Sequence, residues 1–229
     1  MTYVEVARHD ERWAQIRLDR PEAHNAISTG FATDLAQACA QVSADPTVSA
    51  VVLTSTAERS FCVGADLKER NTLSDAQLMA QRLVFRHAFD AVRALPVPAV
   101  AAVHGFALGG GLEIALCCDL IVADETAVCG LPEVSLGLVP GGGGTQLLAR
   151  RIGPAAAADL IFTARRVGID EATRLGLVDR RVPAGGDHAA AIELARQIAA
   201  HSPVGLRNAK HALRAGLDVP LETGLDIED

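Results

Sequence analysis

The order of apolar and polar positions predicts strands that alternate with helices along the chain. Strict alternation over residues 3–6 and 13–18 predicts two antiparallel strands joined near Asp10 and Glu11. Short apolar runs predict strands covered on both faces, at 48–53, 100–103 and 120–123. Helical spacing predicts the remaining elements, at 28–43, 74–95, 112–117, 145–150, 154–162, 170–175, 187–200 and 203–215. Strands that alternate with helices predict an α/β domain.

Two of the predicted helices carry clear start or stop signals. Ser28 is a suitable N-cap for a helix that runs to about Ser43 and buries Phe31, Leu35, Ala38 and Val42. The helix from about Ser74 ends before Pro96 and Pro98. Its predicted inward face consists of Leu78, Leu83, Phe85, Phe89 and Val92. The stretch 61–64 between these helices is predicted to be a loop.

Composition narrows the class of protein. A chain of 229 residues fits one compact domain. No apolar run approaches the roughly 18 residues of a membrane span, and the first residues lack a secretory pattern, so we expect a soluble cytoplasmic protein. A net charge of -7 counts against nonspecific binding of nucleic acid. An odd number of cysteines without a C-x-x-C pair predicts buried free thiols at Cys39, Cys62, Cys117, Cys118 and Cys129.

Two glycine clusters, at 109–111 and 141–144, raise the question of nucleotide binding. A dinucleotide fingerprint that begins at Gly109 would need glycine where Ile114 lies, and one that begins at Gly141 would need glycine where Gln146 lies. Phosphate-loop, nucleophile-elbow and zinc-helix motifs are also missing from the sequence. The first cluster opens a predicted helix, so its amides could stabilise a developing oxyanion. A tight turn with purely steric glycines is the alternative.

Two carboxylates stand in apolar surroundings. Glu113 follows the first glycine cluster inside a segment apolar enough to be buried, and Glu133 follows Pro132. Burial of a carboxylate is costly and shifts its pKa toward values useful in proton transfer, so the two could form an acid/base pair. Each could instead be an ordinary carboxylate favoured at a helix start. Their spacing alone does not bring them together.

At these residues the chain resembles the crotonase (enoyl-CoA hydratase/isomerase) superfamily over essentially its whole length. Four segments in the family order carry the resemblance: 18–27 (LDRPEAHNAI), 61–68 (FCVGADLK), 104–113 (HGFALGGGLE) and 132–146 (PEVSLGLVPGGGGTQ). The resemblance implies the ClpP/crotonase-like α/β fold, a spiral of ββα units with C-terminal helices. It places the core at 1–200 and the start of a helical region, short for the family, at 201–229. It also implies trimers or pairs of trimers.

The implied activity is hydration of the 2,3-double bond of a 2-enoyl-CoA to give a 3-hydroxyacyl-CoA. The resemblance assigns the oxyanion hole to the N–H groups of Ala65 and Gly110. Glu113 would activate water for attack at C3, Glu133 would deliver a proton to C2, and the N–H of Gly141 would position the water. No metal or redox cofactor is implied, because CoA belongs to the substrate.

The resemblance also implies where CoA binds. It assigns the loop around His24 and the stretch Ala65, Asp66, Leu67 and Lys68 to that region, together with Gly110. Lys68 could instead be a solvated surface lysine, and His24 an ordinary loop residue.

Other activities of the superfamily stay open. The stretch 64–70 and the four-glycine run also resemble the methylglutaconyl-CoA hydratase branch, whose animal members include an RNA-binding protein. Enoyl-CoA isomerisation and a non-enzymatic or RNA-binding role are further alternatives. The presence of both Glu113 and Glu133 favours hydration over isomerisation, and the net charge does not favour RNA.

Overall fold

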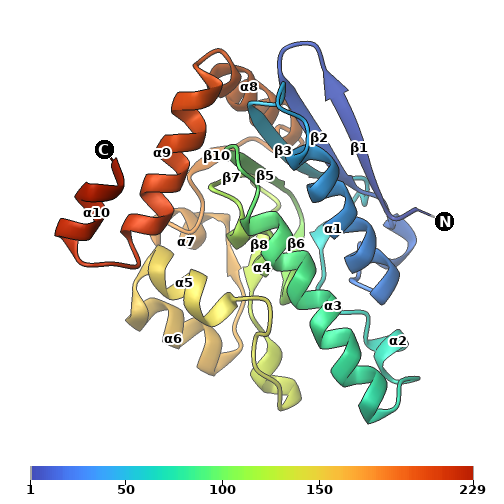
Figure 1. The fold of residues 1–229 in the computed structure, drawn as a ribbon. Helices are drawn as coiled ribbons and strands as arrows, with labels where there is room; N and C mark the ends of the chain where they lie inside the picture. Colours follow the sequence, from blue (N-terminus) through green and yellow to red (C-terminus); the bar gives the residue numbers. More distant parts are fainter. Residues whose placement is uncertain (1, 229) are drawn as a thin grey trace.

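A computed structural model describes residues 2–228, and a six-stranded sheet forms its centre (Figure 1). The first two strands are antiparallel, as predicted, and the others join in parallel. In sheet order the strands are β1 (Val4–His9), β2 (Trp13–Leu18), β3 (Ala50–Ser55), β5 (Ala99–Val103), β7 (Leu120–Asp124) and β10 (Arg180–Val182).

Helices cover both faces of this sheet. On β3, Ala50 and Val52 pack in one cluster with α8 (Asp187–Ala199), while Val51 and Leu53 pack in another with the helices opposite. Those opposite helices are α1 (Thr29–Ser43), α3 (Asp75–Arg93) and α4 (Gly110–Cys117). Successive strand residues point to opposite faces, so burial on both sides requires the continuous apolar runs found in the sequence.

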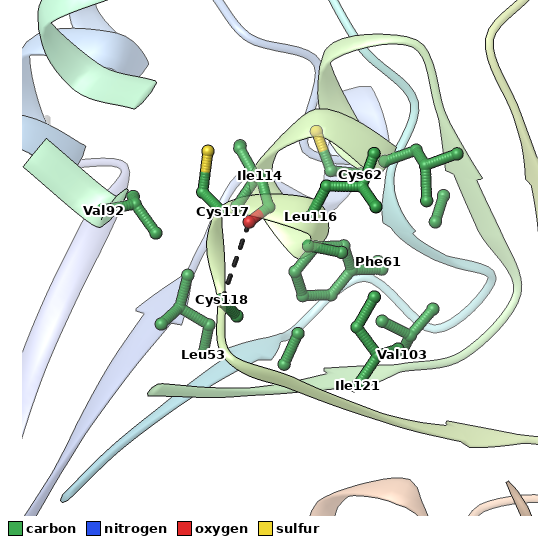
Figure 2. Close-up of a cluster of buried hydrophobic side chains, with 14 of the residues drawn as sticks. Leu53, Phe61, Cys62, Val92, Val103, Ile114, Leu116, Cys117, Cys118 and Ile121 are labelled. Atoms are coloured by element: carbon green, nitrogen blue, oxygen red, sulfur yellow. Dashed lines mark hydrogen bonds between the residues drawn. The ribbon is translucent and has the colours of Figure 1, made fainter. Parts of the chain in front are cut away.

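The larger cluster joins the central strands to α4 (Figure 2). Leu53, Val103 and Ile121 come from three neighbouring strands and lie in the same cluster as Phe61 and Ile114. All five cysteines are buried free thiols, as predicted. Burial raises the pKa of four of these thiols to about 12, and that of Cys118 well above its usual value. The cysteines therefore act as small apolar side chains.

A second, smaller sheet lies beside the first. Its strands are β4 (Ser60–Cys62), β6 (Phe106–Leu108), β8 (Val128–Gly130) and β9 (Val167–Gly168). The first three are parallel neighbours, and β9 is antiparallel to β8. The prediction of a loop over 61–64 was therefore wrong at its start, because β4 occupies part of it. Strands of two or three residues are too short to show alternation, and they form only through pairing with distant segments.

The predicted starts of α1 and α3 are confirmed. Ser28 caps α1 by accepting the N–H of Phe31 at 3.1 Å, and Ser74 forms a capping box with Gln77 at the start of α3. One residue of the predicted inward face of α3 was wrong, because Leu83 is 70% exposed and Gln81 is buried instead. Gln81 lies four residues before Phe85, on the same side of the helix, whereas Leu83 points away from both.

The second half of the chain is mainly helical. Two 3-10 turns, η1 (Pro21–Ala23) and η2 (Glu133–Leu136), and the short helix α2 (Leu67–Arg70) stand before it. The helices are α5 (Gly144–Ile152), α6 (Pro154–Thr163), α7 (Ile169–Arg174), α8, α9 (Pro203–Gly216) and α10 (Leu221–Glu228). Buried Lys210 anchors α9 by donating to Val97 O at 2.7 Å and pairing with Asp119 at 2.8 Å. No helix within residues 2–228 is both long and apolar enough to cross a membrane.

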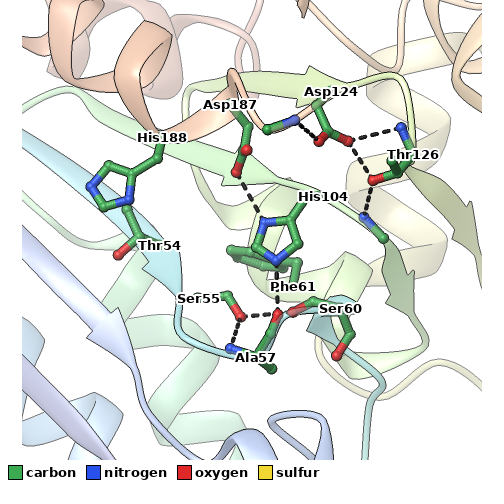
Figure 3. A network of polar contacts seen from close by, with 12 residues as sticks. Thr54, Ser55, Ala57, Ser60, Phe61, His104, Asp124, Thr126, Asp187 and His188 are labelled. Carbon is green, nitrogen blue, oxygen red and sulfur yellow. Dashed lines mark hydrogen bonds and ion pairs between the residues drawn. The ribbon is translucent and has the colours of Figure 1, made fainter. Parts of the chain in front are cut away.

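A polar network holds the start of α8 against the large sheet (Figure 3). His104 Nδ1 lies 3.0 Å from Asp187 Oδ2, and its Nε2 lies 2.8 Å from Ala57 O. Nearby, Asp124 accepts the N–H of Gly185 at 2.7 Å. The hydrogen bond to Asp187 raises the pKa of His104 despite burial. Burial alone would raise the pKa of Asp187, but the hydrogen bond from His104 lowers it.

These two pKa shifts predict a pH window of added stability. The His104 contribution is complete below about pH 6.5 and is lost as pH rises through its higher folded pKa. The Asp187 contribution is complete above about pH 3.9 and is lost as pH falls through its lower folded pKa. We expect Asp187→Asn to lower the free energy of unfolding by about 1–3 kcal/mol between those values, and by less outside them. Urea unfolding across pH measures this, and a difference independent of pH would contradict it.

Candidate active site

The predicted site residues follow three parallel strands of the small sheet. Ala65 lies just after β4, Gly110 begins α4 two residues after β6, and Glu133 begins η2 three residues after β8. Because parallel strands end at the same edge of a sheet, their carboxyl ends bring these segments together. Residues separated by almost 70 positions therefore share one location.

Two close backbone contacts fix the distance between β4 and α4. A methyl carbon on Gly111 would lie 1.9 Å from Cys62 O, closer than any real contact. A methyl carbon on Gly64, which has a φ of +90°, would lie 3.2 Å from the N atom of Gly110. Only glycine permits this approach, and it places the Ala65 segment directly beside the first turn of α4.

Glu113 is buried at that first turn and has two backbone donors. Its Oε1 accepts the N–H groups of Gly142 and Gly144, each at 2.8 Å. The pKa of Glu113 is raised to about 7, chiefly by burial and also by the nearby Glu133 carboxylate, while the two amides and Arg70 limit the rise. The side chain is therefore rigidly held and titrates near neutral pH.

Glu133, the first residue of η2, also lies beside the start of α4. Its Oε1 would lie 2.9 Å from a methyl carbon on Gly109, whose carbonyl accepts the N–H of Glu113 at 3.0 Å. Burial raises the pKa of Glu133 as well. Its Oε2 is buried and has no hydrogen-bond partner among residues 2–228. The structure thus brings Glu113 and Glu133 together and leaves the buried Oε2 of Glu133 without a partner among residues 2–228.

The N–H groups of Ala65 and Gly110 lie at the same edge. The backbone around Ala65 bonds to Ile27 through Gly64 O and Asp66 N, which leaves the Ala65 N–H outside that pairing. Within the described part of the chain, neither the Ala65 N–H nor the Gly110 N–H donates a hydrogen bond to the protein. Both residues are half-buried. Two donors are therefore available at the end of α4 that attracts negative charge.

Gly141 precedes the two glycines that donate to the Glu113 carboxylate and does not itself donate to it. It is exposed, and the amides that hold Glu113 belong to Gly142 and Gly144. The sequence showed the glycine run but not these roles. Four consecutive glycines look alike in a sequence, and the turn that enters α5 decides which amides point inward. The water-positioning role of Gly141 stays a prediction.

The residues predicted to hold CoA are spread over a wider surface. Asp66 caps α2 by accepting the N–H groups of Lys68 and Glu69, and it pairs with Arg20 at 2.7 Å. Asp66 and Lys68 line a cavity of about 410 Å³, whose other walls are Tyr3, Arg20, Ser28, Gly30 and Glu69. Leu67, which stands between these two residues in the sequence, is exposed and does not line the cavity.

His24 does not line that cavity. It is exposed with a positive φ of 53°, and its Nδ1 lies 3.3 Å from Ser60 Oγ. The structure therefore brings Asp66 and Lys68 together and leaves His24 outside the cavity.

This arrangement suits the chemistry of a carbonyl compound. Two backbone donors can stabilise negative charge that develops on a carbonyl oxygen. Two carboxylates with raised pKa values can exchange protons with the neighbouring carbons or with water. The like charges of such a pair disfavour double ionisation, so the pair retains one proton over a range of pH.

Comparison with known proteins places this geometry in a family. The sequence matches enoyl-CoA hydratase/isomerase over residues 8–229. The chain is 37% identical to short-chain-enoyl-CoA hydratase of Clostridium acetobutylicum, with 97% of this chain and 85% of that protein aligned. It is 40% identical to the mitochondrial methylglutaconyl-CoA hydratase of Mus musculus, with 93% and 69% aligned.

The fold agrees with the sequence match. A crystal structure of enoyl-CoA hydratase from Bacillus anthracis superimposes with a TM-score of 0.96 at 38% identity, over 99% of this chain and 88% of that one. The predicted crotonase fold is confirmed. With its sequence, fold and paired carboxylates in agreement, the chain belongs to the enoyl-CoA hydratase/isomerase family.

Proposed function

We propose that this protein is a hydratase that adds water across the 2,3-double bond of a 2-enoyl-CoA. One observation carries the proposal. Glu113 and Glu133 lie close together beside the N–H groups of Ala65 and Gly110, which donate no hydrogen bond within residues 2–228. The thioester oxygen would lie between the two N–H groups, with the double bond facing the carboxylates.

Each group then has one task. Ionised Glu113 takes a proton from water as its oxygen attacks C3, and electron density moves through C2 onto the thioester oxygen. The N–H groups stabilise the resulting enolate. Glu133 gives its proton to C2, which restores the thioester and completes the 3-hydroxyacyl-CoA. Binding of the distant CoA portion would position the reacting carbons, and the reaction requires no metal or redox cofactor.

Hydration is favoured over isomerisation by the number of carboxylates. Movement of a double bond needs one group that removes a proton and returns it to another carbon. Activation of water together with protonation of C2 uses two groups. Both Glu113 and Glu133 are buried or half-buried at one place, so the pair supports the reaction that uses both.

Assembly and location remain proposals. We propose the trimer or pair of trimers typical of the superfamily. Apolar side chains on α9 and α10 support association, because Leu213, Leu217 and Leu221 are at least 70% exposed. We also propose a cytoplasmic location.

Removal of the second carboxylate tests the reaction. We expect Glu133→Gln to lower kcat for crotonyl-CoA hydration by about 10²–10⁴-fold, because the amide cannot donate the proton to C2. Glu58→Gln, a change of the same type at an exposed position, should leave kcat within about twofold of the parent. Loss of the double-bond absorbance measures turnover. Absence of parental turnover with any 2-enoyl-CoA would contradict hydration, and conversion of a 3-enoyl-CoA to a 2-enoyl-CoA would indicate isomerisation.

The pH dependence provides a separate test. Glu113, with a pKa of about 7, must be ionised, whereas the partner carboxyl must carry a proton. We expect a bell-shaped plot of kcat/KM against pH, falling at low pH as the base is protonated and at high pH as the acid ionises. In Glu133→Gln the alkaline fall should disappear because the ionising acid is lost, while the acid limb should persist because Glu113 still has to be ionised. An unchanged profile in the variant would count against these roles.

The backbone hold on Glu113 can be tested through Gly144. A methyl carbon at Gly144 would lie 2.9 Å from Glu113 Oε1, so Gly144→Ala should displace the carboxylate. We expect kcat to fall by about 10- to 100-fold, since small misplacements of a catalytic group are costly. Gly168→Ala is the matched control, because a methyl carbon there meets nothing within 4 Å. Equal activity of the two variants in the hydration assay would show that this contact is not needed.

A further inference from the structure

The short helix α2 begins two residues after Ala65 and lies beside the first turns of α3 (Figure 1). None of its residues, 67–70, is buried, and its one apolar side chain, Leu67, is 47% exposed. Apolar packing therefore does not fix α2, and polar contacts decide where it lies. Because Ala65 supplies one candidate oxyanion donor, the contacts that hold α2 also bear on that donor.

The backbone of Ile27 sets the direction of the Ala65 N–H. Ile27 N donates to Gly64 O at 2.8 Å, and Ile27 O accepts the N–H of Asp66 at 2.9 Å. The Gly64 carbonyl and the Ala65 N–H belong to one planar trans peptide, so this N–H points away from Ile27. The direction of the donor thus depends on how the chain before α1 lies against the chain before α2.

A second contact joins the same two chain segments, at Thr29 and Glu69. The N–H of Thr29, the first residue of α1, donates to Glu69 Oε2 at 2.9 Å. From α3, Gln81 Nε2 donates to Thr29 Oγ1 and to Glu69 Oε2, each at 2.9 Å. Gln81 therefore bonds both members of this contact and holds the start of α1 against α2.

Gln81 is a buried amide on a helix face that is otherwise apolar. It is 3% exposed. The other buried residues of α3 are Phe85, Ala88, Phe89 and Val92. Burial of an amide is costly unless its donors and acceptor are paired, and the Gln81 oxygen is paired with Arg70 Nε at 3.1 Å. Only one orientation of the amide satisfies all three contacts, so its polar atoms hold α1 and α2 in one arrangement.

The same helix also packs against the second oxyanion donor. Phe89 lies two turns after Gln81 on the buried face of α3. Its ring lies 3.4 Å from the position of a methyl carbon on Gly110. One helix therefore contacts the segments that carry both donors, Ala65 through Gln81 and Gly110 through Phe89.

We propose that Gln81 is a positioning residue for the oxyanion hole, which holds the chain before α2 so that the Ala65 N–H faces the thioester oxygen. The inference rests on the proposed hydratase function, which assigns that oxygen to the N–H groups of Ala65 and Gly110. Gln81 acts through Thr29 and Glu69. Loss of one oxyanion donor costs about 10²–10³-fold in rate, so a displaced donor should cost part of that factor.

The test exchanges the partners at the second contact. Gln81→Glu places a carboxylate against the Glu69 carboxylate, so the contact should open. Glu69→Gln keeps an oxygen that accepts both N–H groups, and Glu69→Gln/Gln81→Glu again sets a donor opposite an acceptor, with the two side chains exchanged. Gln41→Glu, the same change at an exposed position of α1, is the control.

The readout is the absorbance of bound 4-dimethylaminocinnamoyl-CoA, a conjugated thioester. Hydrogen bonds to its thioester oxygen draw electron density from the amino group toward the carbonyl and move the absorbance to longer wavelength. We expect about half of the parental shift in Gln81→Glu, and the parental shift in Glu69→Gln and in Gln41→Glu. The double variant should recover most of the shift. For crotonyl-CoA hydration, kcat should fall by about 10- to 100-fold in Gln81→Glu and recover in the double variant.

The wavelength also separates positioning from stability. It is read only from protein that has bound the probe, so partial unfolding lowers the amplitude of the signal without moving its wavelength. A parental shift in Gln81→Glu would overturn the inference, and so would a reduced shift that the double variant does not recover. If Gln81→Glu does not fold, Gln81→Met takes its place, and a parental shift there would overturn the inference.

The outcomes for the parent separate the inference from the function. A parental shift that depends on Gln81, without hydration of any 2-enoyl-CoA, would support the inference and contradict the proposed function. Hydration by the parent with equal shifts in all variants would contradict the inference alone. Absence of a shift in the parent would overturn the inference, because the thioester oxygen would then not meet the two N–H groups.

Discussion

The site depends on the close approach of two backbone segments, the end of β4 with the residues just after it and the start of α4. Cys62 O occupies the space that any side chain at Gly111 would need, and Gly64 lies against Gly110 in the same way. A bulkier residue would move α4 away from β4. Because α4 carries both Glu113 and the Gly110 N–H, a shift of this helix would separate these two groups from Glu133 and from the Ala65 N–H.

The electrostatics of the site follow from that packing. Burial and the neighbouring Glu133 favour the protonated form of Glu113, while two amides from the turn before α5 favour the ionised form. The opposing effects leave a carboxyl whose pKa lies near neutrality, although a free glutamate would be fully ionised there. A rigid carboxylate with that pKa can accept a proton and release it in the same cycle.

The two sheets contribute differently to the structure. The large sheet is buried on both faces and provides a rigid support for α1, α3, α4 and α8. The small sheet consists of short strands, and the segments after them carry the candidate site residues. Helix α3 joins the two regions, because its buried face holds Gln81 and Phe85 near Arg70 and Phe89 near the glycine amides.

The sequence by itself determined the long strands and helices, the cap at Ser28, the helix start near Ser74 and the identity of the two glutamates, since these depend on neighbouring residues. Family resemblance added their proposed roles. Only the tertiary structure decided that β4, β6 and β8 pair, that Gln81 and not Leu83 faces inward, and that Gly142 and Gly144 hold Glu113. Each of these depends on contacts between residues distant in the chain, which local spacing does not encode.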